Sequence, residues 1–230
     1  MELCTGGLPW YAIAISAVGA YFLGNINPAI IIGRAKGIDI RAQGSGNAGA
    51  TNALRSLGKA SGALTFIIDV VKGWAGYFLP LIIFKDIPLS LLCGLCVVIG
   101  HMYPAIFGFR GGKGVSTTFG VLLSASPVYA LILLAVVIVF TVIFRRVSLS
   151  VMIAVAVALV LIFWGGGFQG ESFLYDVGFL QFNVYEPLWV IIILALVVWK
   201  HHENIKRLLR GQEPKLKFGS GKKDKKGSEG

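Results

Sequence analysis

The chain has 230 residues, of which 56% are hydrophobic and 14% charged, and its mean hydropathy is +0.77. A typical soluble domain has about 45–50% apolar and about 25% charged residues, so this composition excludes a soluble or a disordered protein. Residues 3–33 and 115–144 contain no charged residue, and about 20 apolar residues cross a bilayer as a helix. The sequence therefore predicts an all-α integral membrane protein.

Apolar segments, taken in chain order, predict seven membrane helices. The run 115–144 would be about 45 Å long as one helix, whereas the hydrocarbon core is about 30 Å thick. Pro127 also disfavours helix at Ser126, so this run is expected to form a short helix and a full span. The seven segments are bounded approximately by residues 8–33, 62–84, 88–109, 115–125, 127–144, 147–166 and 187–200.

The distribution of charge predicts the orientation. With seven segments, 19 of the 21 Lys and Arg residues lie on the side of the C-terminus, Lys85 lies on the other side, and Lys72 lies within a span. Positive residues concentrate in cytoplasmic loops, so the N-terminus is predicted outside and the C-terminus inside. The net charge of +10 is thereby explained without a nucleic-acid partner.

The chain is predicted to form one polytopic membrane domain, residues 1–218, followed by a disordered basic tail, residues 219–230, which lacks apolar residues to bury. Cys93 and Cys96 form a C-x-x-C pair inside an apolar segment, without a second pair to complete a zinc site. We expect both to pack, and we predict no metal site.

The first polar, Gly-rich segment runs from Gly44 to Asn52, with Arg55 after it. Small residues let a ligand approach the backbone, while Ser, Asn, Thr and Arg side chains supply hydrogen-bonding groups. The density of these groups favours a ligand site over a plain connector.

The second segment, Gly111-Gly112-Lys113-Gly114, precedes a predicted helix. A helix N-terminus presents unpaired N–H groups and a partial positive charge to an anion, and Lys113 adds a full charge. The nucleotide P-loop pattern is absent, because Phe107 stands at its first glycine position and Gly114 at its Ser/Thr position. The pattern therefore indicates phosphate or carboxylate without indicating nucleotide, with a flexible basic loop as the alternative.

The third segment extends from Lys200 to Glu213. His201, Asn204 and Arg207 share a helix face by their i, i+3 spacing, and a histidine can accept a proton near neutral pH. A basic helix end at the membrane surface is the alternative. Asp69 and Lys72 lie within a span and are expected to pair with each other or with these loops, since ionisable groups in spans mark functional sites.

Four stretches closely resemble the motifs of the bacterial PlsY family: GSGNAGATNALRSLGK, DVVKG, GHMYPAIFGFRGGKGVSTTFG and KHHENIKRLLRGQEPKLKFG. The resemblance runs from about Gly24 to Phe218. It implies an integral-membrane enzyme of the bacterial plasma membrane that transfers a fatty acyl group from acyl phosphate to glycerol 3-phosphate. It also implies seven helices with the N-terminus outside, a site facing the cytoplasm, and no acyl-CoA, metal or cofactor. It names no obligate protein partner.

Together, the polar segments and the resemblance predict three groups of site residues. Catalytic roles are expected for Ser45, Arg55, Lys113, His201 and Asn204. Substrate-binding roles are expected for Gly44, Gly46, Asn47, Thr51, Asn52, Gly111, Gly112, Gly114 and Ser116. Supporting roles are expected for Asp69, Lys72, His101 and Glu213.

A transporter of a phosphorylated solute is the alternative function, since it too requires intramembrane charges and an anion site. Transporters commonly contain two related halves, and this sequence shows no internal repeat. The polar segments also gather on one predicted face, which favours the enzyme.

Overall fold

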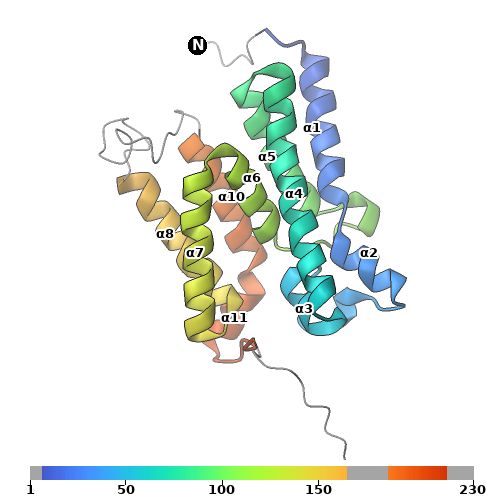
Figure 1. Cartoon of the computed structure of the whole chain (residues 1–230), viewed down its shortest axis with the longest axis vertical. Helices are drawn as coiled ribbons and strands as arrows, with labels where there is room; N and C mark the ends of the chain where they lie inside the picture. The colour runs from blue at the N-terminus through green and yellow to red at the C-terminus, as the bar shows by residue number, and fades with distance from the viewer. Residues whose placement is uncertain (1–6, 165–185, 217–230) are drawn as a thin grey trace, which may run out of the picture.

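The computed structural model describes residues 7–164 and 186–216, and every regular element within them is helical (Figure 1). Glu171, Asp176 and the predicted tail at 219–230 lie outside the described residues. The α-helices are α1 (Trp10–Asn25), α2 (Pro28–Ala35), α3 (Ala50–Leu57), α4 (Lys59–Phe84), α5 (Ile87–Met102), α6 (Val115–Ala125), α7 (Pro127–Phe144), α8 (Val147–Trp164), α10 (Glu186–Lys200) and α11 (His202–Leu209); two short 3₁₀ helices are η1 (Ile40–Ala42) and η2 (Ala105–Phe107).

The predicted break at Pro127 is confirmed. Helix α6 ends at Ala125, Ser126 has an extended φ of −148°, and α7 begins at Pro127. Proline has no N–H to donate, so the first position of a helix is where it costs least. The segments predicted near 62–84, 147–166 and 187–200 correspond to α4, α8 and α10.

Two other predicted spans contain a helix break that was not predicted. The segment 8–33 is not one helix, because α1 and α2 are separated at Ile26–Asn27 and bend by 41°. Asn27 caps α2 by accepting a hydrogen bond from the N–H of Ile30 at 3.1 Å, directly before Pro28. The predicted span 88–109 corresponds to the candidate span 87–107, within which α5 ends at Met102, because Pro104 follows, and η2 extends to Phe107.

Among the described residues, three helical segments are long and apolar enough to cross a membrane: 59–84, 87–107 and 127–144. The number rises to five if the bent pairs α1–α2 and α10–α11 each count as one span, and α6 and α8 are shorter apolar helices. The seven-span topology and its orientation therefore stay predictions.

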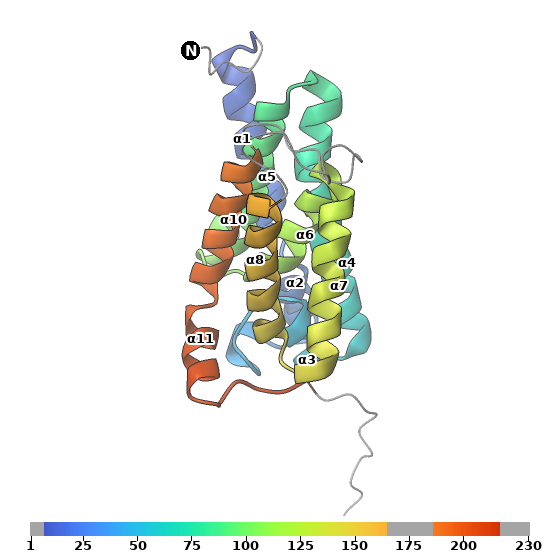
Figure 2. The same ribbon diagram turned by 90° about the vertical axis from the view of Figure 1, so that its left-hand side faces the viewer.

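Helix α6 lies inside the bundle, where it packs against α4, α5 and α7 (Figures 1 and 2). The contact with α4 requires glycine on both helices. A Cβ on Gly73 would overlap the carbonyl of Thr117, and a Cβ on Gly120 would overlap the carbonyl of Val70. This close approach fixes the N-terminus of α6 beside α4, where the candidate site lies.

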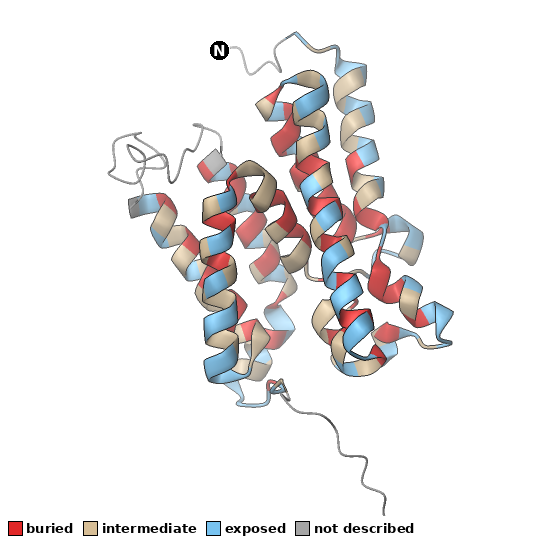
Figure 3. Cartoon of the chain, in the orientation of Figure 1, coloured by how far each residue is buried: buried red, intermediate tan, exposed pale blue. Residues whose placement is uncertain are grey.

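The buried core joins α5, α6, α7, α8 and α10 through residues such as Val97, Val121, Tyr129, Ala158 and Ile193. By contrast, one side of α7 exposes Leu131, Ile138 and Val142, and α4 exposes Ile67 and Val71 (Figure 3). Exposed apolar stripes of this kind mark a membrane-facing surface.

Candidate active site

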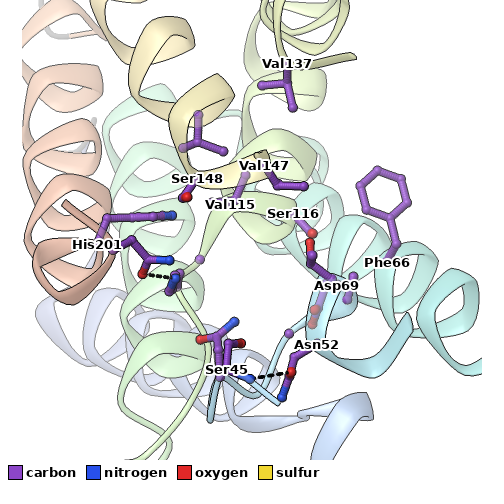
Figure 4. Close-up of a pocket in the computed structure, with 18 of the residues that line it drawn as sticks. Ser45, Asn52, Phe66, Asp69, Val115, Ser116, Val137, Val147, Ser148 and His201 are labelled. Carbon is purple, nitrogen blue, oxygen red and sulfur yellow. Dashed lines mark hydrogen bonds between the residues drawn. The ribbon is translucent and has the colours of Figure 1, made fainter. Parts of the chain in front are cut away.

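A polar cavity of about 170 Å³ lies where the three predicted segments meet. Figure 4 shows Ser45 and Asn52 on one side of it, Asp69 and Ser116 on another, and His201 and Ser148 opposite. The predicted residues that line it are Ser45, Asn47, Thr51, Asn52, Arg55, Asp69, His101, Lys113, Gly114, Ser116, His201, Asn204 and Glu213. Segments separated by more than 150 residues in the sequence thus form one site.

The first loop is held by Asn52, whose side chain is buried. Its amide nitrogen donates to the carbonyls of Ile40 at 3.1 Å and Gln43 at 2.9 Å, and its oxygen accepts from the N–H of Ser45 at 3.0 Å. Asn52 was predicted to bind substrate, but these bonds already occupy its amide. Its observed contacts position Ser45.

Gly44 and Gly46 do not line the cavity, and their role in substrate binding stays a prediction. Their φ values of 58° and 71° lie in the left-handed region, which glycine enters without steric cost. These two glycines turn the chain so that Ser45 faces the cavity. No hydrogen bond from the Ser45 hydroxyl to another described residue is observed, so the hydroxyl is available to a ligand.

The anion loop, residues 111–114, is attached to the end of α5. The N–H of Gly111 donates to the carbonyl of Met102 at 3.3 Å, and the N–H of Gly112 donates to that of His101 at 3.1 Å. These two glycines do not line the cavity, and their role in substrate binding stays a prediction. The N-terminal end of α6, with Gly114 and Ser116, faces the cavity instead.

Lys113 is connected to the third segment through Asn204. The Lys113 ammonium donates to Asn204 Oδ1, and Asn204 Nδ2 donates to Glu213 Oε1 at 2.6 Å. An ammonium only donates and a carboxylate only accepts, so the two neighbours determine which way the amide points. Glu213 also accepts from Ser148 Oγ at 2.6 Å and Arg207 Nε at 2.8 Å.

The electrostatics of the site favour an anion. Burial lowers the pKa of Lys113 to about 8, with Arg207 and Arg55 acting in the same direction and Glu213 opposing them. Burial also lowers the pKa of Arg55, which stays charged because arginine is not deprotonated in proteins. Burial raises the pKa of Glu213, but hydrogen bonds from Ser148, Arg207 and Asn204 outweigh it and leave the pKa below its usual value.

His201 is buried at the junction of α10 and α11 and faces the cavity. Its Nδ1 lies 2.7 Å from the carbonyl oxygen of Val197. Because a carbonyl oxygen only accepts, Nδ1 carries a hydrogen, and in a neutral ring Nε2 is then the acceptor.

Asp69, Lys72 and His101 form a buried cluster, of which Asp69 and His101 line the cavity. The predicted Asp69–Lys72 pair is confirmed, with 2.8 Å between Lys72 Nζ and Asp69 Oδ1. Lys72 does not line the cavity, but its ammonium donates to the carbonyls of Gly24 and Ile26, where α1 ends. His101 lies 2.9 Å from Lys72 Nζ through its Nδ1.

A second cavity, of about 110 Å³, adjoins the first and is lined mainly by apolar side chains. The two cavities share Phe66, Val115, Ser116, Val137 and Val151. Of these residues, only Ser116 was predicted from the sequence as a site residue, and Ser148 was not predicted either. A hydroxyl two residues after Arg145-Arg146 carries no motif, and single valines in apolar helices do not reveal which of them face a groove.

No group of three or more His, Cys, Asp or Glu side chains in the described part of the chain is arranged to hold a metal ion. The site thus combines cationic side chains, an unpartnered hydroxyl and an adjoining apolar groove within a helical membrane protein. Such a site suits a molecule with an anionic group and an apolar chain.

The chain belongs to the glycerol-3-phosphate acyltransferase family, whose model matches residues 14–211. A glycerol-3-phosphate acyltransferase of Clostridioides difficile is 40% identical over 212 residues, covering 90% of this chain and 96% of the relative. Two crystal structures of the integral membrane glycerol 3-phosphate acyltransferase PlsY, in its glycerol 3-phosphate and lysophosphatidic acid forms, match with TM-scores of 0.78 and 0.75. They are 37% and 36% identical, and each match covers 90% of this chain and 96% of the other.

The pKa of Lys113 predicts the alkaline limb of the pH profile. Lys113 is charged below about pH 8 and loses its charge above it, so kcat/KM for glycerol 3-phosphate should fall as the pH rises through about 8 in the free enzyme. Lys113→Arg keeps the charge at every pH and should move this limb upward by at least one pH unit. Steady-state rates from pH 6 to 10, corrected for non-enzymatic hydrolysis, measure it; an unmoved limb in Lys113→Arg would assign it to another group.

Proposed function

We propose that this protein transfers a fatty acyl group from acyl phosphate to the sn-1 hydroxyl of glycerol 3-phosphate, giving lysophosphatidic acid and phosphate. The observation that carries the proposal is the pair of joined cavities. One presents Arg55 and Lys113, which suit phosphate, and the other has an apolar lining, which suits an acyl chain.

The reaction needs positioning more than a covalent nucleophile. Acyl phosphate is a mixed anhydride and is already activated. The hydroxyl oxygen attacks the acyl carbon, the bond from that carbon to the phosphate oxygen breaks, and the departing phosphate takes the hydroxyl proton. Holding the reactants in register can contribute about 7–11 kcal/mol to lowering the barrier.

Arg55 and Lys113 would neutralise two phosphates that otherwise repel each other. The Ser45 hydroxyl, held at the cavity by Asn52, is our candidate donor to the carbonyl oxygen as negative charge develops on it. Glu213 would act through Asn204, by keeping the amide oxygen directed at Lys113. In this proposal the protein lies in a bacterial plasma membrane, and its site faces the cytoplasm.

The choice of acyl donor tests this proposal. Purified protein is supplied with glycerol 3-phosphate and either palmitoyl phosphate or palmitoyl-CoA, and lysophosphatidic acid is measured. We expect product from palmitoyl phosphate alone. Product from palmitoyl-CoA at a comparable rate would contradict the proposed donor, and transport of glycerol 3-phosphate into vesicles without acylation would favour the transporter.

The proposed orientation makes a separate prediction. A cysteine introduced near Glu171 should react with an impermeant thiol reagent added outside intact cells, whereas one near Gly211 should react only after permeabilisation. The parent should carry Ser in place of the native cysteines, so that each label reports one position. The reverse pattern would overturn both the positive-inside argument and the cytoplasmic site.

A further inference from the structure

His101, like His201, is a buried side chain that lines the polar cavity and has one ring nitrogen without a hydrogen-bond partner in the described part of the chain. Only 2% of the surface of residue His101 is exposed. Its Nδ1 lies 2.9 Å from Lys72 Nζ and 3.3 Å from Asp69 Oδ1. Nε2 has no hydrogen-bond partner among the described residues, although the ring lines the polar cavity. A buried nitrogen without a protein partner, facing a cavity, points to a ligand.

The neighbours of Nδ1 determine the tautomer. The Lys72 ammonium has three hydrogens and no lone pair, so it can only donate to Nδ1. Placing a hydrogen on Nδ1 instead would direct it at a cation 2.9 Å away, while its other partner, Asp69 Oδ1, is farther, at 3.3 Å. Nδ1 is therefore the acceptor, and the hydrogen of the neutral ring is on Nε2.

The location of Nε2 is fixed by the anion loop. A Cβ built on Gly112 would overlap Nε2 and would lie 2.8 Å from the carbonyl oxygen of Ala48. Nε2 of His101 therefore lies where the anion loop meets the first polar loop. Gly112, the residue it contacts, directly precedes Lys113 in the chain. The absence of a side chain at Gly112 leaves room for the ring at this point.

We propose that His101 binds a phosphate oxygen of one of the two substrates through its Nε2–H, and that Lys72 is the positioning residue that holds this tautomer. The inference rests on the proposed function and extends it to a residue beneath the anion loop. Asp69 also faces the cavity, but Lys72 balances its charge at 2.8 Å. The cluster thus supplies a neutral donor beside the charged Lys113 and Arg55.

Two substitutions separate this role from a structural one. In glutamine the amide nitrogen can occupy the place of Nε2, whereas in asparagine the shorter amide reaches only the place of Nδ1. We expect His101→Asn to raise the KM for one substrate about tenfold or more, as for loss of a hydrogen bond to a charged group. His101→Gln should recover most of that loss, with a KM at least fivefold below that of His101→Asn.

The substrate whose KM rises, glycerol 3-phosphate or acyl phosphate, is the one whose phosphate binds His101. If His101 served only as a partner of Lys72, the order would reverse and His101→Asn would be the better enzyme. Equal effects of the two substitutions, or no effect, would also contradict the proposal.

A measurement on the unmodified protein keeps the inference testable if the variants fail to fold. In ¹⁵N-histidine spectra of the detergent-solubilised protein, His101 should show a protonated Nε2 and an unprotonated Nδ1, and glycerol 3-phosphate or inorganic phosphate should shift the Nε2 signal. A protonated Nδ1, or an Nε2 signal that neither anion moves, would overturn it. This readout does not depend on acyl transfer, so it separates failure of the inference from failure of the proposed function.

Discussion

Replacing Lys113 with alanine is expected to raise the KM for glycerol 3-phosphate at least tenfold. The ammonium is partly buried, lines the polar cavity and is held there by Asn204. A hydrogen bond to a charged group contributes about 1.5–3 kcal/mol, which corresponds to about a tenfold to hundredfold change in binding. Steady-state kinetics at saturating acyl phosphate give the KM directly.

Lys206→Ala is the matched control for Lys113→Ala. Lys206 is also a lysine of the cytoplasmic side in the predicted topology, but its side chain is 59% exposed and pairs with Glu203 at the surface. Such pairs contribute little, so its removal should leave the KM within about twofold. A folded Lys113→Ala variant with unchanged KM and kcat would remove Lys113 from the site.

Replacing Ser45 with alanine is expected to lower the rate about 10²–10³-fold, the usual effect of losing one donor to a developing oxyanion. The effect should fall on kcat, because the charge on the carbonyl oxygen develops in the transition state. Ser150→Ala, which removes a hydroxyl on α8 outside the cavity, controls for the loss of a serine within the bundle. A loss confined to KM would show that Ser45 binds substrate without stabilising the oxyanion.

The same residue raises the question of a covalent intermediate, and we expect none. A serine nucleophile needs an adjacent base, and no hydrogen bond joins the Ser45 hydroxyl to a histidine in the described structure. Enzyme incubated with labelled acyl phosphate in the absence of acceptor should carry no label after digestion. An acyl group on Ser45, formed and discharged at the turnover rate, would contradict direct transfer.

Hydropathy, segment length and proline positions predicted most of the helices. They were insufficient where a predicted span is interrupted. Pro127 lies within the run 115–144, which is too long for one span, so both length and proline chemistry indicated the break. Asn27-Pro28 interrupts the segment 8–33, which was predicted as one span, and the capping bond from Ile30 to Asn27 marks the start of a new helix there. Hydropathy averages over such a break, because the residues on both sides of it are apolar.

The site was predicted in outline, because its three segments are rich in Gly and polar residues. What the sequence could not predict is how hydrogen bonds are shared once the chain folds. The N–H groups of Gly111 and Gly112 are taken by carbonyls at the end of α5, and the amide of Asn52 is taken by its own loop. Ser148 joins the site only because α8 passes beside Glu213.

Product stoichiometry tests direct acyl transfer from acyl phosphate most directly. Purified protein in detergent is given palmitoyl phosphate with and without glycerol 3-phosphate, and orthophosphate and lysophosphatidic acid are both quantified. We predict one orthophosphate for each lysophosphatidic acid, and no enzyme-dependent release of orthophosphate when glycerol 3-phosphate is left out. Enzyme-dependent release without acceptor, or orthophosphate without an equal amount of lysophosphatidic acid, would contradict the proposed reaction.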